Sequence, residues 1–138
     1  MSDVSRERLE KAIESSPFSR WVGVTIARYE AGSIEIDLPL RDVLTQHHGF
    51  AHGAIVGYMA DTACAWAAAS VAGDVVTAEY KINFLAPAVG ERLTATGRVI
   101  KLTTRSAIAQ ADVFVHAAGE TKLVAVALAT IARLDPRP

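Results

Sequence analysis

One stretch of this 138-residue chain is almost entirely apolar, whereas the segments around it alternate between apolar and polar positions. The apolar stretch runs from Ala54 to Ala72 and holds a single charged residue, Asp61. Alanine and other small residues dominate it, and no basic residues anchor its ends. These features indicate a helix buried inside a soluble domain rather than a membrane span. Gly73 and Asp74 are expected to end this helix.

Alternating apolar positions predict strands on both sides of the helix. Before it, residues 21–40 predict two strands joined by a turn at residues 31–32. Consecutive strands after the helix have short connections, so we expect them to pair antiparallel. The face of the first of these strands is expected to carry Val76, Ala78, Tyr80, Ile82 and Phe84. The strands expected after the helix span about residues 75–85, 92–102, 106–116 and 123–134.

The expected fold is α+β, with a curved antiparallel sheet of five or six strands wrapped around one long central helix. A single sheet can shield so apolar a helix only by curling around it, and a second subunit is expected to cover the remainder. A short amphipathic helix at about residues 3–15 is expected to precede the sheet and to end at Pro17. The chain length predicts one domain over residues 1–138.

Composition narrows the classes of function. The formal net charge of −1 gives no electrostatic footprint for non-specific binding to nucleic acid. The single cysteine, Cys64, excludes an internal disulfide and agrees with a cytoplasmic location. The charged N-terminal segment lacks the apolar run of a secretory signal. We therefore expect a cytoplasmic protein that binds neither nucleic acid nor membranes.

Asp61 is the first candidate functional residue. A carboxylate buried in an apolar helix is costly unless it is paired or used, and buried ionisable groups concentrate at functional sites. The competing interpretation is a structural carboxylate that caps a backbone group or binds a cation across an interface. Cys64 lies one helical turn away, but a neighbouring carboxylate disfavours a thiolate, so we expect Cys64 to pack in the core.

Gly53 is the second candidate, because it lies where the loop meets the helix and backbone N–H groups are unpaired. A glycine lets a ligand approach the backbone, where an N–H can stabilise an oxyanion; the alternative is a glycine needed only for the turn. Gly53 and Asp61 are eight residues apart, which is about 12 Å along a helix. One substrate carbonyl cannot meet both in one chain, so a joint role requires two copies.

The segment QHHGFAHGAIVGYMADTA resembles the signature of the PaaI-like acyl-CoA thioesterases of the hotdog superfamily. The later segment VVTAEYKINFLAPA resembles the family's strand and its Pro-Ala ending, and the resemblance covers roughly residues 17–134. Ala54 departs from the family's second glycine, and Gln46 stands where many relatives have asparagine. The positions that match the signature are Gln46, Gly49, His52, Gly53, Asp61, Thr62 and Ala63.

This resemblance implies a hotdog-fold thioesterase that hydrolyses an acyl-coenzyme A, with an aromatic or a short- to medium-chain acyl group, to free acid and CoA. Asp61 would act as nucleophile or general base, the Gly53 N–H would polarise the thioester carbonyl, and Gln46 would position water or the thioester. Thr77 would orient the water beside Asp61. In relatives the glycine and the acid come from opposite subunits, which implies a homodimer with shared sites, and a dimer of dimers as the homotetramer.

Cationic and hydroxyl side chains suit the phosphates of coenzyme A, and relatives often place the nucleotide near the turn that follows residue 102 here. An ordinary solvated turn, and a structural role for His52 before the helix, are the competing interpretations. The candidate substrate-binding residues are His47, His52, Arg98, Lys101, Thr103, Thr104, Arg105 and Ser106.

Other readings of the same residues lead elsewhere. The histidines at 47, 48 and 52 lack a cysteine or a second acidic ligand, so we expect no metal and no cofactor. Tyr58, Met59 and Trp66 either line an acyl pocket or fill the core. A non-catalytic acyl-CoA-binding sensor or scaffold is the alternative function. A hotdog dehydratase is a third possibility, but dehydratases carry a different motif, in which a catalytic histidine is used beside an acid.

Overall fold

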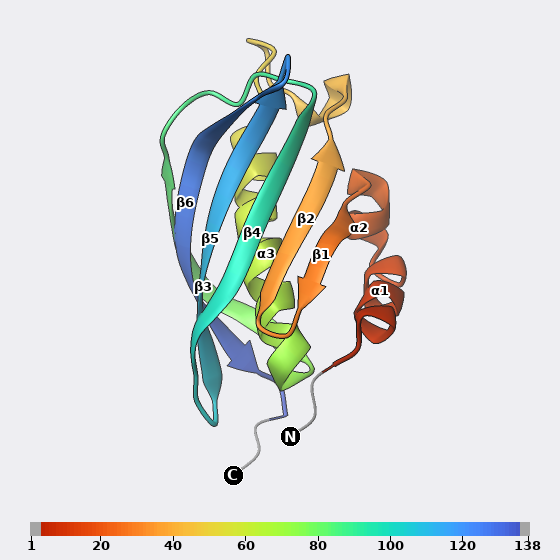
Figure 1. The fold of residues 1–138 in the computed structure, drawn as a ribbon, viewed down its shortest axis with the longest axis vertical. Helices are drawn as coiled ribbons and strands as arrows, with labels where there is room; N and C mark the ends of the chain where they lie inside the picture. The colour runs from red at the N-terminus through yellow and green to blue at the C-terminus, as the bar shows by residue number, and fades with distance from the viewer. Residues whose placement is uncertain (1–3, 136–138) are drawn as a thin grey trace.

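Six antiparallel strands form one sheet around helix α3 (Gly53–Ala72) in residues 4–135, the part of the chain that the computed structural model describes (Figure 1). This is the α+β architecture that the sequence predicts. The other elements are α1 (Arg6–Glu14), α2 (Pro17–Val22), β1 (Thr25–Glu30), β2 (Ser33–Pro39), a short 3-10 turn (Asp42–Leu44), β3 (Val75–Phe84), β4 (Arg92–Leu102), β5 (Ser106–Ala117) and β6 (Glu120–Arg133).

The strand order is β1-β2-β4-β5-β6-β3, so β3 lies at one edge of the sheet. Tight hairpins join β4 to β5 and β5 to β6, the second through Ala118 and Gly119, which have φ values of 51° and 80°. The prediction that all consecutive strands pair is wrong for β3, which pairs with β6 instead of β4. The hairpins place β5 and β6 on one side of β4, and β2 occupies its other side. The edges that remain are those of β1 and β6, and β3 pairs with β6.

The N-terminal segment is more helical than its pattern predicts. The structure confirms a helix, α1, within the expected range of about 3–15, of which residue 3 lies outside the described part. Helix α2 was not predicted from the sequence, because Pro17 was interpreted as the end of helical structure and Trp21 as the start of a strand. Pro17 instead stands in the first turn of α2, where a missing N–H costs nothing. Gly23, in the left-handed region, ends this helix.

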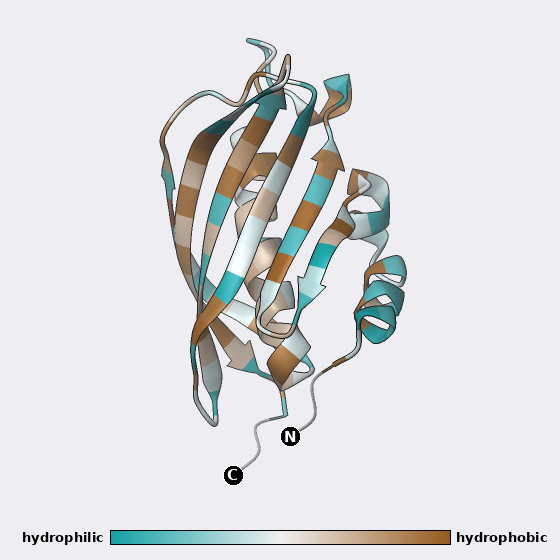
Figure 2. Cartoon of the chain, in the orientation of Figure 1, coloured by the Kyte–Doolittle hydropathy of each residue, from teal (hydrophilic) through white to brown (hydrophobic). Residues whose placement is uncertain are grey.

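The inner face of the sheet packs on α3 and forms the core. Along β2, Ile34, Ile36 and Leu38 are fully buried, and Figure 2 shows the alternation of brown and teal bands that their spacing produces. On β4, a Cβ at Gly97 would lie only 2.2 Å from the carbonyl oxygen of Ala63 in α3. The small residues of both elements therefore permit unusually close packing of the helix on the sheet.

Within the described residues, α3 is the one helix long and apolar enough to cross a membrane. Most of its apolar window, 61%, is buried inside the domain, so its composition is that of a core helix. One side of α3 is only half-buried in the single chain, and this is the part of the helix that a second subunit is expected to cover. The half-buried residues are Tyr58, Asp61, Ala65, Trp66, Ala69, Val71 and Ala72.

Candidate functional site

The Asp61 carboxylate lies midway along α3 and is hydrogen-bonded to strand β3. The hydroxyl of Thr77 donates to Asp61 Oδ1 over 2.5 Å. The two residues are sixteen positions apart in the chain and meet because β3 runs beside α3 at the edge of the sheet. A carboxylate held in this way has a fixed orientation, and its second oxygen remains available to water or substrate.

A β-bulge between Thr77 and Glu79 turns Thr77 toward the helix. The prediction that Val76 shares a face with Ile82 and Phe84 is wrong, since one extra residue inverts the alternation. Val76 is 51% exposed, and Phe84 would lie 3.8 Å from a Cβ placed on Gly53 of α3. The bulge therefore puts a hydroxyl where the regular strand would put an apolar side chain.

Asp61 is half-buried in the single chain. The physical reason is the position of β3, because no strand of the described chain lies beyond this edge to cover the carboxylate. The apolar neighbours of Asp61 along α3 shield only one side of it. In the single chain, Asp61 is thus a held but accessible carboxylate.

The N–H of Gly53 is open at the start of α3. His52 is the N-cap of this helix, and its Nδ1 accepts a hydrogen bond of 2.9 Å from the N–H of Ala54. The N–H groups of Ile55 and Val56 both donate to the His52 carbonyl. No residue of the described chain accepts from the Gly53 N–H, which leaves it as a donor at the positive end of the helix.

No contact within the described residues requires glycine at position 53. Its φ lies outside the left-handed region, and a Cβ there would make only ordinary contact with the Phe84 ring at 3.8 Å. Gly57 and Gly97 differ, since a Cβ would lie 3.0 Å from the Tyr80 hydroxyl or 2.2 Å from a backbone oxygen. The absence of a side chain at Gly53 therefore leaves room beside an unpaired N–H, as an approaching ligand requires.

Gln46 supplies a second donor near Gly53. It stands at the base of a small loop, where its N–H donates to the Phe50 carbonyl over 2.9 Å. Its side-chain oxygen accepts from the N–H of His48, which assigns the amide oxygen to the loop. The side-chain NH₂ has no partner among residues 4–135 and remains available as a donor.

A cavity of about 380 Å³ brings Gln46 and Gly53 together. Its apolar wall was not anticipated from the sequence. The walls are formed by Phe50, Ala51, Val56, Phe84, Leu85, Ala86, Pro87 and Ala88.

Asp61 and Thr77 do not line the cavity of Gln46 and Gly53. Asp61 lies about two helical turns beyond Gly53 on α3, about 12 Å by helix rise, and Thr77 contacts it from β3. The structure thus divides the four predicted catalytic residues into two pairs, one of hydrogen-bond donors and one of an acid with its hydroxyl partner.

The histidines before α3 have different surroundings. His52 has the structural role of the N-cap described above. His47 and His48 lie exposed at the tip of the loop, with ring centroids 4.1 Å apart. In the part of the chain that is described, no three His, Cys, Asp or Glu side chains converge in a way that would hold a metal ion.

The predicted coenzyme A contacts do not form one cluster. Arg98 lies on β4 and donates to Gln110 Oε1 over 3.0 Å. The Thr103 hydroxyl closes the β4–β5 turn, since it donates to the Ser106 carbonyl over 3.0 Å and accepts from the Ser106 N–H. Lys101, Thr104 and Arg105 remain exposed, with no side-chain partner in the described residues. The turn lies toward the C-terminal end of α3, opposite Gly53 (Figure 1).

Cys64 and Tyr58 flank Asp61 but are poorly suited to nucleophilic attack. Burial and, secondly, the negative charge of Asp61 raise the pKa of Cys64 to about 12. Burial also raises the pKa of Tyr58, opposed by hydrogen bonds with Ser19 and Thr62, with Asp61 adding to the rise. Both groups are therefore neutral near pH 7 and are weak nucleophiles there.

The sequence model of the thioesterase superfamily matches residues 48–121, more than half of the chain. The protein therefore belongs to the thioesterase superfamily. The match includes Gly53, Asp61 and Thr77, and membership supports thioester hydrolysis as the general class of reaction.

Solved structures confirm the hotdog fold. A thioesterase family protein from Silicibacter pomeroyi is 33% identical, with a TM-score of 0.87 over 90% of this chain and 93% of its own. A conserved protein from Pseudomonas aeruginosa is 28% identical, with a TM-score of 0.80 over 95% of this chain and all of its own. The PaaI protein of E. coli has a TM-score of 0.86 over 94% and 93% of the two chains, and at 21% identity it supports the fold alone.

A curated relative from Saccharolobus solfataricus carries the provisional name of an esterase. It is 32% identical over 84 residues, which is 59% of this chain. The match spans 60% of that relative, so the chain covers less than two thirds of its length.

Proposed function

We propose that the protein hydrolyses an acyl-coenzyme A thioester at a site formed by two copies of the chain. The observation that carries this proposal is the division of the site. One pair, Gly53 and Gln46, offers two unpaired donors beside a cavity, and the other, Asp61 and Thr77, offers an oriented carboxylate. Because Gly53 and Asp61 lie about 12 Å apart on one helix, the two pairs can act on one carbonyl only across an interface.

The two pairs suit the two sides of a thioester carbonyl. The Gly53 N–H and the Gln46 NH₂ would hold the carbonyl oxygen and stabilise the oxyanion that forms. Asp61 of the other copy would remove a proton from water, whose hydroxide adds to the carbonyl carbon, or would attack that carbon directly. The C–S bond then breaks and the CoA thiolate receives a proton, so that acid and CoA leave.

The exposed edge of β3 supports a second copy as the partner. This ten-residue strand pairs only with β6 among the described strands, and such an edge readily pairs with another chain. Apolar side chains stand exposed along it, including Val76 at 51%, Phe84 at 56% and Leu85 at 54%. An isologous contact along β3 would run antiparallel and would direct Gly53 of one copy toward Asp61 of the other. A dimer of dimers is part of the same proposal.

The basic turn between β4 and β5 is the proposed contact for the phosphates of coenzyme A. Lys101 and Arg105 are exposed there without side-chain partners in the described chain, and Thr104 adds a hydroxyl. Arg98, His47 and His52 complete the proposed set, with His52 acting through the loop that it caps. Thr103 and Ser106 would contribute by holding the turn.

The test is steady-state hydrolysis of a panel of acyl-CoAs by the wild-type chain and by Asp61→Asn. We expect turnover of at least one acyl-CoA and a loss of about 10³-fold in kcat for Asp61→Asn, with the fold retained. Asp42→Asn, an exposed substitution in the 3-10 turn, is the matched control and should keep wild-type activity. Binding of acyl-CoA without turnover would favour the sensor or scaffold alternative and overturn the proposal.

A further inference from the structure

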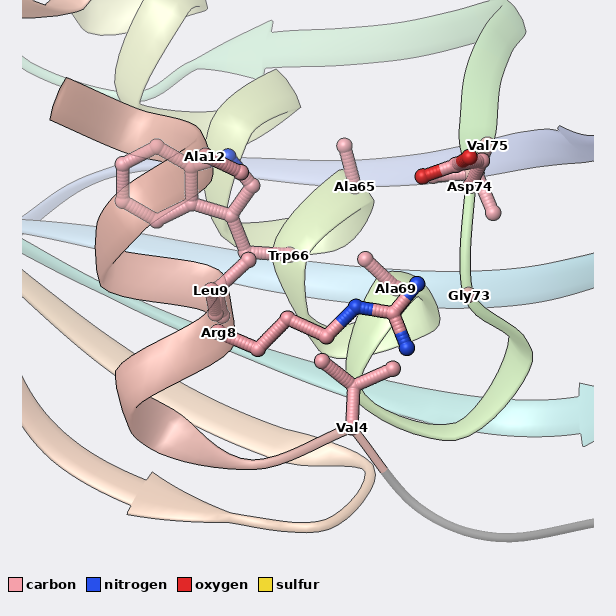
Figure 3. Close-up of a pocket in the computed structure, with 10 residues that line it drawn as sticks. All are labelled: Val4, Arg8, Leu9, Ala12, Ala65, Trp66, Ala69, Gly73, Asp74 and Val75. Atoms are coloured by element: carbon pink, nitrogen blue, oxygen red, sulfur yellow. The ribbon is translucent and has the colours of Figure 1, made fainter. Parts of the chain in front are cut away.

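A second cavity, of about 230 Å³, lies between α1, the C-terminal half of α3 and the start of β3 (Figure 3). Figure 3 shows the Trp66 indole beside Ala12 and the Arg8 side chain extending from α1 toward Ala69. Most of the cavity wall is apolar. The apolar wall includes Leu9, Ala12, Ala65, Trp66, Ala69 and Val75.

The cavity continues two rows of residues that begin at the Asp61–Thr77 pair. On α3, Asp61, Ala65 and Ala69 follow one another at intervals of four residues and so share a face. On β3, Val75 and Thr77 are two residues apart and face the same side. Thr77 contacts Asp61, and Val75 lines the cavity. Asp61 and Thr77 do not themselves line the cavity, and by helix rise its lining residues Ala65 and Ala69 lie about 6 Å and about 12 Å from Asp61 along α3.

Small residues keep this space open, and charged ones mark its outer end. Ala65 and Ala69 are half-buried and present only methyl groups to the cavity, and Gly73 presents no side chain. Arg8 and Asp74 line the cavity but are exposed, and neither side chain has a hydrogen bond or ion pair with another described residue. An apolar acyl chain that reached past Arg8 and Asp74 would displace water from their charged groups, and this desolvation costs free energy.

We propose that this cavity receives the acyl group of the substrate and selects apolar, unbranched acyl chains of medium length. The proposal rests on thioester hydrolysis at Asp61 and names the substrate class of that site. A groove along one helix face accommodates a straight chain, and its apolar walls favour a chain without a charge at its far end. Ala69 sets the length that is accepted, because its methyl group lies near the end of the groove.

The experiment compares kcat/KM for a series of straight-chain acyl-CoAs between the wild type, Ala69→Leu and Val71→Leu. Val71 is half-buried on α3 but does not line the cavity, so its variant is the matched control. We expect Ala69→Leu to lower kcat/KM for octanoyl-CoA about tenfold and to leave butanoyl-CoA within about twofold. Val71→Leu should leave the length profile unchanged. An Ala69→Leu profile with the wild-type optimum, or a preference for phenylacetyl-CoA that Ala69→Leu does not alter, would overturn the proposal.

A binding measurement separates failure of the cavity assignment from failure of the proposed function. Trp66 lines the cavity, and the chain has only one other tryptophan, so Trp21→Phe leaves Trp66 as the sole indole. We expect octyl-CoA, a thioether that cannot be hydrolysed, to change Trp66 fluorescence saturably, and Ala69→Leu to weaken this binding about tenfold. A chain that hydrolyses nothing but shows this response refutes the thioesterase and keeps the cavity. An active chain without the response does the reverse.

Discussion

The Thr77 hydroxyl donates a 2.5 Å hydrogen bond to Asp61 Oδ1, and this contact depends on one irregular position in β3. The bulge before Glu79 turns Thr77 toward α3, whereas an unbroken strand would turn it away. The orientation of the proposed catalytic acid is thus set by the backbone of a neighbouring edge strand. A local departure from regular pairing is a common way to aim a side chain into a site.

Replacing Thr77 tests whether this hydrogen bond orients Asp61 for catalysis. We expect Thr77→Val to lower kcat about 100-fold with KM nearly unchanged, because the carboxylate loses the donor that fixes its position. Thr77→Ser keeps the hydroxyl and should recover activity to within about fivefold of the wild type. The measurement is steady-state kinetics on the best acyl-CoA of the panel. Equal activity of the valine and serine variants would show that the hydroxyl has no positioning role.

Two glycine substitutions should have opposite effects on stability and activity. A Cβ at Gly53 makes ordinary contact at 3.8 Å, so Gly53→Ala should change the free energy of unfolding by less than about 1 kcal/mol. The added methyl stands beside the open N–H, and we expect kcat/KM to fall about 100-fold. Gly97→Ala forces a Cβ within 2.2 Å of the Ala63 carbonyl and should destabilise the fold by about 3 kcal/mol.

Urea unfolding and acyl-CoA kinetics on both variants check this pair. A Gly53→Ala chain that loses stability to the same extent as Gly97→Ala would mean that position 53 needs glycine for folding. Full activity of a stable Gly53→Ala chain would instead remove Gly53 from the proposed oxyanion site.

The hydrophobic pattern predicted most of the fold because most strands and turns are determined by residues close together in the sequence. Strand alternation at Ile34, Ile36 and Leu38 and the turn at residues 31–32 depend on neighbours in the chain. The pairing of β3 with β6 and the bulge at Thr77 depend on partners tens of residues away, so no local pattern reports them. Pro17 illustrates a third limit, since the same residue can end one helix or begin the next.

The candidate site was recognisable as residues but not as an arrangement. The sequence singled out Asp61, Gly53, Gln46 and Thr77. The helix rise per residue was enough to estimate that Asp61 and Gly53 lie about 12 Å apart. The sequence could not reveal that Asp61 is half-exposed, because exposure depends on where the sheet ends. Nor could the sequence show that the Thr103 hydroxyl donates to the Ser106 carbonyl within the β4–β5 turn, because this contact depends on the folded backbone.

The raised pKa of Cys64 predicts a specific loss of stability at high pH. Burial and the charge of Asp61 move this pKa from 9.0 to about 12, so the folded state keeps the proton that the unfolded chain releases. The contribution is fully present below pH 9 and is lost as pH rises from 9 toward 12. The wild type should therefore be less stable at pH 10 than at pH 8, by roughly 1 kcal/mol.

The measurement is urea unfolding of the wild type and Cys64→Ala at pH 8 and pH 10. The alanine variant is less stable at both values because it leaves a small cavity, but it should lack the thiol-dependent decrease. Comparing the two chains cancels the contribution of Tyr58, whose pKa is also raised by burial. Parallel decreases in both chains would contradict the assignment to Cys64. Slow reaction of the native thiol with alkylating reagents at pH 8 is expected for the same reason.

Mixing two inactive chains tests whether the site is shared between copies. Asp61→Ala removes the acid and Gln46→Ala removes a donor of the other pair, so each homodimer should be inactive. In a hybrid dimer, one of the two sites combines the intact Asp61 of one chain with the intact Gln46 of the other. Random exchange at equal concentrations makes half of the dimers hybrid, and activity should return to about a quarter of the wild-type value.

The recovery must depend on exchange of subunits rather than on mixing alone. Partial unfolding in urea followed by refolding, with hybrid formation confirmed by tags of different mass on the two chains, provides that control. A double variant carrying both Asp61→Ala and Gln46→Ala, exchanged with the wild type, places both defects on one chain and gives hybrids in which each site lacks one group. Those hybrids should be inactive, unlike the hybrids of the two single variants. Confirmed hybrids of the single variants without activity would require Asp61 and Gln46 to act within one chain, although Gly53, beside which Gln46 stands, lies about 12 Å from Asp61 along α3.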